Sequence, residues 1–200
     1  MKLLREFIAQ LLNEPHSAKI DGFVVPFLPH PPQGTESELA DLHNTIHQHT
    51  HRRVPDSLQE AADSSMLRIF KQHLHNNGYP FDKARLKSIK KLIKPTIKRL
   101  KHHYARPRPH VVAKSWGIPW SGDYLESAQT PSYPSGHATQ AYTVALILAN
   151  QHPEEEENLL NIAEIVAQSR IDRGVHFQSD VDYGRELAYV LAQQILENMP

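Results

Sequence analysis

The sequence predicts an all-α fold, arranged as a single-domain helical bundle. A chain of 200 residues is long enough to bury one sizeable core. Apolar residues recur at helical spacing in several segments, which are bounded by capping residues, prolines or glycines. No segment alternates apolar and polar residues in the way that a half-buried strand would. These observations together favour helices packed on helices.

The N-terminal part, about residues 1–80, is predicted to combine helices with a proline-rich arm. The arm covers residues 15–35, where prolines and a glycine favour extended backbone. Thr35 and Glu38 have the spacing of a capping box, which predicts a helix start. The helices expected in this part cover about residues 1–14 (amphipathic), 35–51 and 55–76.

The C-terminal part, about residues 81–200, carries the candidate chemistry. A basic helix is expected over 81–103, because lysines and arginines surround a regular apolar stripe. Residues 105–134 are rich in proline, glycine and aromatic residues, and predict a long ordered loop of the kind that is usually functional. Three further helices are expected over about residues 136–151, 153–171 and 179–198.

Composition excludes several classes of protein. Lys plus Arg equals Asp plus Glu at 22 each, so the chain has no general attraction for nucleic acid. The absence of cysteine excludes disulfides and thiolate metal sites. The longest apolar run, Ala141 to Ala149, is far shorter than the roughly 20 residues of a membrane span. Since no signal peptide is visible either, the sequence predicts a cytoplasmic protein without a membrane partner.

A first cluster of candidate site residues is cationic. Lys101 and Arg108 lie seven residues apart, at the end of the basic helix and in the turn before Pro109. The Arg side chain offers a planar fork for two phosphate oxygens, and Lys offers a point charge. Alone, this pattern is more typical of an ordinary basic helix end.

A second cluster, Pro134-Ser135-Gly136-His137, precedes the most apolar helix of the chain. The free N–H groups and the positive dipole end of that helix would face an anion here. Gly136 would let the backbone approach the anion closely, and Ser135 could cap the helix or donate to an oxygen. His137 would project beside the anion from the first turn.

The third cluster contains Ser169 and Arg170 at a predicted helix end, then His176 and Asp180. Four residues separate His176 from Asp180, which is within reach if a helix begins between them. A carboxylate near an imidazole fixes its tautomer, and this arrangement prepares a histidine to act as a nucleophile.

The three clusters, in this order, resemble the signature of the type 2 phosphatidic acid phosphatase superfamily. That superfamily includes vanadium haloperoxidases, membrane lipid phosphatases and bacterial class A acid phosphatases, and the last resemble this chain most. The resemblance covers roughly residues 98–195. It implies a helical bundle of the acid phosphatase and vanadium haloperoxidase type.

The resemblance also implies a role for each residue. His176 would attack phosphorus and form a phosphohistidine, Asp180 would orient it, and His137 would protonate the leaving group and then activate water. The phosphate oxygens would be held by Lys101, Arg108, Ser135, Gly136 and Arg170. The implied activity is that of a metal-independent phosphoric monoester hydrolase acting on a small soluble phosphoester, and related enzymes commonly form homo-oligomers.

Two alternatives stay open. Vanadate mimics the phosphoryl transition state, so the same residues could hold vanadate as the cofactor of a haloperoxidase. A different class is a metal-binding protein, because His43, His47 and His51 recur every four residues on one predicted helix, with His49 beside them. Such a row is more often an exposed polar face.

Overall fold

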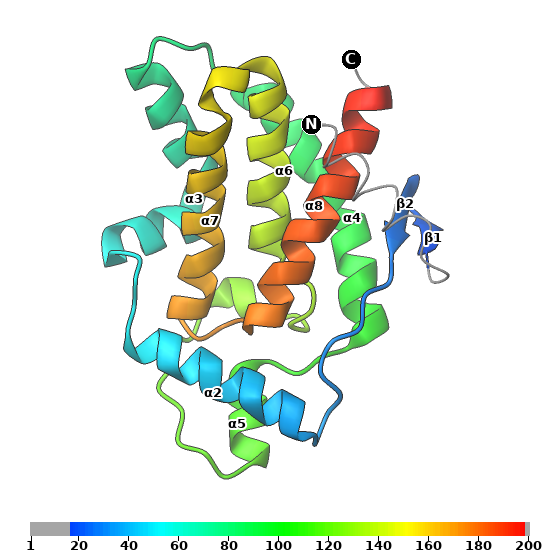
Figure 1. Cartoon of the computed structure of the whole chain (residues 1–200), viewed down its shortest axis with the longest axis vertical. Helices are drawn as coiled ribbons and strands as arrows, with labels where there is room; N and C mark the ends of the chain where they lie inside the picture. The colour runs from blue at the N-terminus through cyan, green and yellow to red at the C-terminus, as the bar shows by residue number, and fades with distance from the viewer. Residues whose placement is uncertain (1–16, 199–200) are drawn as a thin grey trace.

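The most apolar segment of the chain forms the central helix, α6 (Gly136–Gln151), in the computed structural model. The structure describes residues 17–198. Because α6 is apolar on nearly all sides, it needs neighbours around it. Helices α7 (Glu156–Asp172) and α8 (Gln178–Asn198) pack along it, and α4 (Lys83–Tyr104) also contacts it (Figure 1).

The remaining helices cover the outside and one end of this bundle. Helix α3 (Asp56–Asn76) packs on α7, and its backbone is broken at Ser65 (φ −162°, ψ 71°). Helix α2 (Glu36–Thr50) crosses the end of the bundle where α7 ends and α8 begins, with α5 (Pro109–Ser115) beside it (Figure 1). The three sequence clusters therefore lie at the same end of the bundle.

The all-α class is confirmed, with one addition that the sequence analysis did not predict. The proline-rich arm begins with an antiparallel hairpin of β1 (Ser17–Ile20) and β2 (Phe23–Pro26), in which Ile20 pairs with Phe23. The turn residues Asp21 and Gly22 have positive φ values of 49° and 93°. An Asp-Gly pair between apolar residues is the usual signal of a tight hairpin turn, so the sequence did contain this information.

The capping box predicted at the start of α2 is present in a modified form. The Thr35 hydroxyl accepts a hydrogen bond from the Glu38 N–H at 3.3 Å. The Glu38 carboxylate reaches one residue further back and accepts from the Gly34 N–H at 2.9 Å. Both interactions satisfy N–H groups at the start of the helix, which is why it begins here.

The predicted loop over 105–134 contains two short helices, which corrects that prediction. Pro109 starts α5, since its fixed φ suits the first helical position. Val112 and Ala113 then bury their side chains against Leu42 of α2. A short 3₁₀ helix, η1 (Glu126–Ala128), lies further along, and another, η2 (Pro153–Glu155), precedes α7.

Two sequence predictions about the organisation of the chain stay predictions. The amphipathic helix expected over residues 1–14 lies outside the described residues. The division into an N-terminal part and a C-terminal core stays a prediction. Within residues 17–198, no helix combines the length and the apolar content that crossing a membrane requires.

Gly184 of α8 allows close contact with the start of α6, and we expect Gly184→Ala to destabilise the protein. A Cβ atom there would lie 2.9 Å from the Ser135 carbonyl oxygen and 3.1 Å from the Ala138 Cβ. Alanine favours an isolated helix over glycine by about 1 kcal/mol, but overpacking against backbone costs about 1–3 kcal/mol. Urea denaturation should show a net loss of about 1 kcal/mol, the difference between a mid-range overpacking cost and the gain in helix propensity. Glu197→Ala, at an exposed position of the same helix, should change stability by less than about 0.5 kcal/mol. Equal or higher stability of Gly184→Ala would contradict this close packing.

Candidate active site

Asp180, in the first turn of α8, is the buried anchor of the site. Its carboxylate accepts hydrogen bonds from Arg106 Nη1 at 2.8 Å, from the Phe177 N–H at 2.9 Å, and from the Ser132 hydroxyl. Burial alone would raise the pKa of Asp180, but the Arg106 charge and the hydrogen bonds from His176 and Ser132 hold it below its usual range. The carboxylate therefore stays ionised across the physiological pH range.

His176 lies between this carboxylate and a guanidinium. Its Nδ1 is 2.9 Å from Asp180 Oδ2, so the ionised carboxylate fixes the proton on Nδ1. Its Nε2 is 3.0 Å from Arg108 Nη1. Burial, and then the charge of Arg108, hold the pKa of His176 well below its usual value. The ring is therefore neutral, with a lone pair on Nε2.

Lys101 and Arg108 bring two buried positive charges to the site without a carboxylate partner in the described part of the chain. Lys101, in the last turn of α4, donates to the carbonyl oxygens of Pro131 (2.6 Å) and Ser132 (3.1 Å). Arg108 donates to the carbonyl oxygens of Thr130 (2.8 Å) and Val175 (2.6 Å). Burial, and then neighbouring cations, lower the pKa of Lys101 to about 7. Burial also lowers the pKa of Arg108 to about 10. Buried cations in this situation favour a bound anion.

Arg170, near the end of α7, is the third buried cation. It donates from Nη1 to Asp63 Oδ1 at 2.8 Å and from Nη2 to the Ser127 hydroxyl at 3.0 Å. Burial lowers the pKa of Arg170, and the Asp63 charge partly opposes this shift. The charge of Arg170 in turn lowers the pKa of Lys101 and of Arg108, as expected for cations that share one site.

The start of α6 lies against Lys101. Ser135 is the N-cap of the helix: its hydroxyl accepts from the Ala138 N–H at 3.4 Å, and its own N–H donates to the Asp180 carbonyl at 2.8 Å. A Cβ atom on Gly136 would lie 3.8 Å from Lys101 Cε and 3.5 Å from Ile97. The positive end of the helix dipole thus adds to the cationic site.

His137 follows in the first turn of α6 and is only partly exposed. Its Nε2 lies 3.7 Å from Asp63 Oδ1. Burial and the charge of Arg170 lower the pKa of His137 to about 3, although Asp63 opposes the shift. An anion held by Arg170 would neutralise part of that charge and raise the pKa again.

The structure brings the predicted site residues to one end of the bundle and adds residues that the sequence analysis did not assign. Arg106 is fully buried and bridges Asp180 and Asp41, with Nη2 3.0 Å from Asp41 Oδ2. Its guanidinium carbon also lies 3.9 Å from the centre of the Phe177 ring. Asp63 lies between Arg170 and His137, and Ser127 hydrogen-bonds to both Asp63 and Arg170. The signal for Arg106 was its place in the segment Ala-Arg-Pro-Arg-Pro, whereas no local pattern marked Asp63 or Ser127.

Fold and site together define a helical protein in which three buried cations and two histidines lie at one end of the bundle. The chain belongs to the PAP2 superfamily, whose family profile matches residues 91–199. The superfamily resemblance predicted from the three clusters is thus confirmed.

Relatives with a similar sequence are bacterial acid phosphatases. An acid phosphatase of Zymomonas mobilis is 33% identical over 138 residues, which make up 66% of this chain and 50% of the relative. A non-specific acid phosphatase of Providencia stuartii is 31% identical over 121 residues, or 56% of this chain and 48% of the relative. One of Salmonella typhimurium is 37% identical over 91 residues, or 45% of this chain and 36% of the relative. The chain therefore spans half the length, or less, of these relatives.

A solved structure corrects the predicted localisation. It is titled the first transmembrane PAP2 type phosphatidylglycerolphosphate phosphatase from Bacillus subtilis. It matches 100% of this chain and 96% of its own, with a TM-score of 0.57 and 19% identity, which shows a shared fold. The prediction of a cytoplasmic protein, which rested on the lack of a visible signal peptide and membrane span, is therefore wrong, because the same fold also occurs in a transmembrane protein.

The histidines of α2 do not form the metal site that one alternative proposed. No group of three or more His, Asp or Glu residues in the part of the chain that the structure describes is arranged to hold a metal ion. The buried His49 directs its Nδ1 to the Asp172 carbonyl (2.7 Å) and its Nε2 to the Ser121 carbonyl (3.0 Å). His47 and His51 stack on each other at the surface.

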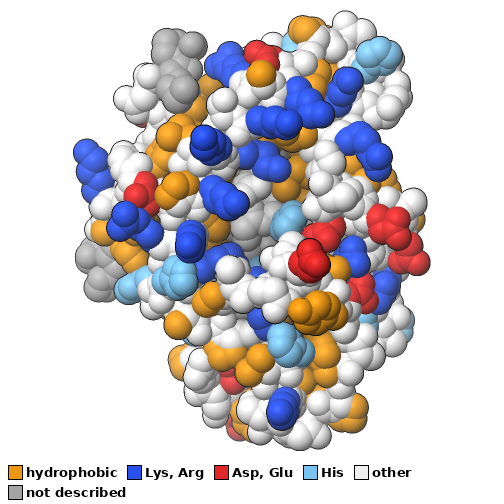
Figure 2. All heavy atoms as spheres, turned by 180° about the vertical axis from the view of Figure 1, so that it is seen from behind, with side chains coloured by type: hydrophobic (Ala, Val, Ile, Leu, Met, Phe, Trp, Pro, Cys, Tyr) orange, Lys and Arg blue, Asp and Glu red, His pale blue; other side chains and the backbone are white. Residues whose placement is uncertain are grey.

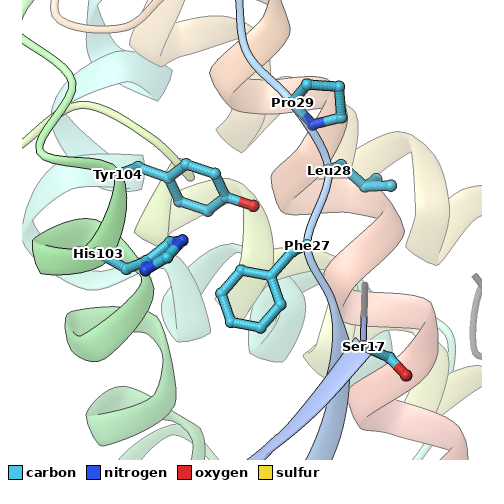
Figure 3. Close-up of a pocket in the computed structure, with 6 residues that line it drawn as sticks. All are labelled: Ser17, Phe27, Leu28, Pro29, His103 and Tyr104. Carbon is cyan, nitrogen blue, oxygen red and sulfur yellow. The ribbon is translucent and has the colours of Figure 1, made fainter. Parts of the chain in front are cut away.

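A separate pocket lies where the hairpin approaches the end of α4 (Figure 3). Its volume is about 650 Å³, and its wall is largely apolar and aromatic. The side chains of His103 and Tyr104 point from α4 toward Phe27 across it (Figure 3). None of the site residues described above lines this pocket, whose walls are Ser17, Phe27, Leu28, Pro29, His103 and Tyr104.

Proposed function

We propose that the protein is a phosphatase that hydrolyses water-soluble phosphomonoesters through a phosphohistidine intermediate and needs no metal ion. One observation carries the proposal: His176 has its Nδ1 held by Asp180 and its Nε2 directed at Arg108. A neutral imidazole in this tautomer is a nucleophile, and Arg108, 3.0 Å from its Nε2, would hold the group that it attacks. The acid phosphatases among the relatives support the same class of reaction.

In the first step, the Nε2 lone pair of His176 forms a bond to phosphorus while the bond from phosphorus to the ester oxygen breaks. The leaving oxygen takes a proton from the cationic form of His137, which the negative charge of the bound phosphate would favour. In the second step, His137 takes a proton from water, and the oxygen of that water attacks phosphorus. The bond from phosphorus to Nε2 then breaks, which restores the lone pair and releases inorganic phosphate.

Charge stabilisation should supply most of the rate acceleration. The equatorial oxygens of the phosphoryl group would be held by Lys101, Arg108, Arg170, the Ser135 hydroxyl and the Gly136 N–H. Phosphoryl transfer depends mainly on such positioning, and one preorganised donor of this kind is typically worth about 10²–10³ in rate. Asp63 brings a negative charge to this group of cations, but it is paired with Arg170. The pairing limits the repulsion between Asp63 and the substrate.

Phosphate release from 4-nitrophenyl phosphate and a panel of phosphomonoesters, measured with EDTA present, tests the proposal. We expect full activity under chelation, and inhibition by orthovanadate, which has the charge and geometry of the transferring phosphoryl group. Loss of all activity with EDTA, with recovery on adding a divalent metal, would contradict the metal-free reaction. Absence of phosphate release from every ester would contradict the function itself.

Asp63→Asn should move the pH profile to lower pH. The Asp63 charge raises the pKa of His137, against burial and Arg170, which lower it. A general acid must be protonated to act, so activity is lost as the pH rises through its pKa. Removing the Asp63 charge lowers that pKa, so the alkaline limb of kcat, which reports the enzyme with substrate bound, should shift to lower pH by about one unit.

The control for this variant is Asp56→Asn, at an exposed position of the same helix, which should leave the limb in place. An unchanged limb in Asp63→Asn would show that Asp63 acts only by holding Arg170. A shift to higher pH would contradict the proposed acid role of His137.

A further inference from the structure

A row of lysines on α4 leads toward the site along one side of the helix. Lys87, Lys90 and Lys94 precede Lys101, and the sequence of α4 contains no Asp or Glu. At about 100° per residue, all three lie within about 40° of Lys101 around the helix axis. Figure 2 shows Lys and Arg side chains in a band across one face, beside a hollow in which a histidine is visible.

This row passes beside the start of α6. Ile97, between Lys94 and Lys101, is the residue that a Cβ on Gly136 would contact at 3.5 Å. At 1.5 Å per residue, Lys94 lies about 10 Å and Lys90 about 16 Å from Lys101 along the axis. Their flexible side chains can cover much of this distance, so the row borders the site on one side.

Electrostatic effects indicate which part of the site the row faces. Burial shifts the pKa of His137 most, followed by the charges of Arg170 and Asp63. Among the weaker influences, the charge of Lys90 lowers this pKa more than the charge of Lys101 does. The half-buried Lys90 has a lowered pKa itself, because of burial first and then the charges of Lys94 and Lys87. No carboxylate within the described chain forms an ion pair with these three lysines. They therefore form an uncompensated cationic surface near the histidine that would protonate the leaving group.

We propose that Lys90 and Lys94 form a second anion subsite for substrates whose leaving group carries a second phosphate. This inference rests on the proposed function, because His137 marks the leaving-group side only in that reaction. The scissile phosphate would occupy the cage of Lys101, Arg108 and Arg170. The second phosphate would then lie along α4, where the flexible side chains of Lys90 and Lys94 could contact it.

The size of the effect follows from the exposure of these lysines. Two unit charges 4 Å apart attract by about 1 kcal/mol in water, and partial burial strengthens the interaction. Two lysines should therefore improve the affinity for a second phosphate by about tenfold or more, since 1.4 kcal/mol corresponds to a factor of ten.

Calorimetric binding of two non-hydrolysable ligands, propylphosphonate and propane-1,3-bisphosphonate, tests the subsite without requiring turnover. We expect the wild type to bind the bisphosphonate at least tenfold more tightly. In Lys90→Gln/Lys94→Gln the ratio of the two affinities, bisphosphonate over phosphonate, should fall below about threefold. That value is close to the statistical factor of two for a symmetric ligand. The matched control, Arg85→Gln/Arg99→Gln, removes two charges from the same helix but far around its axis from Lys101, and it should keep the wild-type ratio.

Two results would overturn the inference: the same ratio in the lysine variant as in the wild type, or an equal loss in the arginine control. Pelleting with phosphatidylglycerol vesicles separates a free second phosphate from a lipid headgroup. Lysine-dependent pelleting without any preference for the bisphosphonate would show a membrane-facing surface instead, and would also overturn it. Hydrolysis of 4-nitrophenyl phosphate by the wild type reports separately on the proposed function, so the two failures are distinguishable.

Discussion

His176→Ala should abolish turnover and leave no phosphoenzyme to trap. The wild type should incorporate one acid-labile, alkali-stable phosphoryl group per chain in a rapid quench with ³²P-labelled substrate. The variant has no Nε2 lone pair to form that bond. Loss of a covalent nucleophile that works with a base and an orienting group typically costs about 10⁴–10⁶ in kcat. We therefore expect activity at or below the detection limit for every substrate that the wild type accepts.

The control for this variant must separate chemistry from folding, because His176 is buried. Thermal unfolding and binding of orthovanadate should persist in His176→Ala, since Lys101, Arg108 and Arg170 remain. His43→Ala, at an exposed position of α2, should leave both activity and phosphoenzyme unchanged. Normal turnover in His176→Ala would contradict the assignment of the nucleophile. Normal turnover together with a trapped phosphoryl group would mean that another residue carries it.

Most helices could be predicted because their signals are local. The apolar run that forms α6, the capping residues of α2 and the proline before α7 each act within a few residues of the structure that they determine. The hairpin was missed because each strand has only four residues, too few for an alternating pattern to stand out. The break at Ser65 of α3 has no local signal, since neither proline nor glycine is near it.

The residues of the candidate site also divide into those with a local sequence signal and those without one. Lys101, Arg108, His137, Arg170, His176 and Asp180 lie in three short segments whose spacing could be recognised. Asp63 could not be recognised from the sequence, because it belongs to α3. It meets Arg170 only because α3 packs on α7. Asp41 of α2 reaches Arg106 in the same way, across 65 positions of sequence. Residues that support a site by long-range contact become visible only in three dimensions.

Arg106→Met should cost about 3–5 kcal/mol of stability at neutral pH, the usual penalty for breaking a buried ion pair from one side. Arg106 is fully buried and bonds to Asp180, Asp41 and Ser179, so its removal leaves two carboxylates without their cation. Methionine keeps most of the volume and the contact with the Phe177 ring, so a cavity does not explain the loss. Urea denaturation should also show that Arg99→Met, which removes an exposed arginine paired with Asp21, costs less than about 1 kcal/mol.

The pH dependence of this penalty distinguishes an electrostatic cause from a packing cause. With Arg106 present, the lowered pKa of Asp180 contributes stability above the pKa of an unfolded Asp, about 3.9, and this contribution is lost as the pH falls. Without Arg106, the largest influence that lowers the pKa of Asp180 is gone, so we expect this pKa to rise and the variant to lose less stability than the wild type as the pH falls. The difference in the free energy of unfolding between wild type and variant should therefore be largest near pH 7 and shrink toward pH 4. A difference that stays constant over this range would show that Arg106 stabilises the fold by packing alone, and that the charge of Asp180 is held by its other donors.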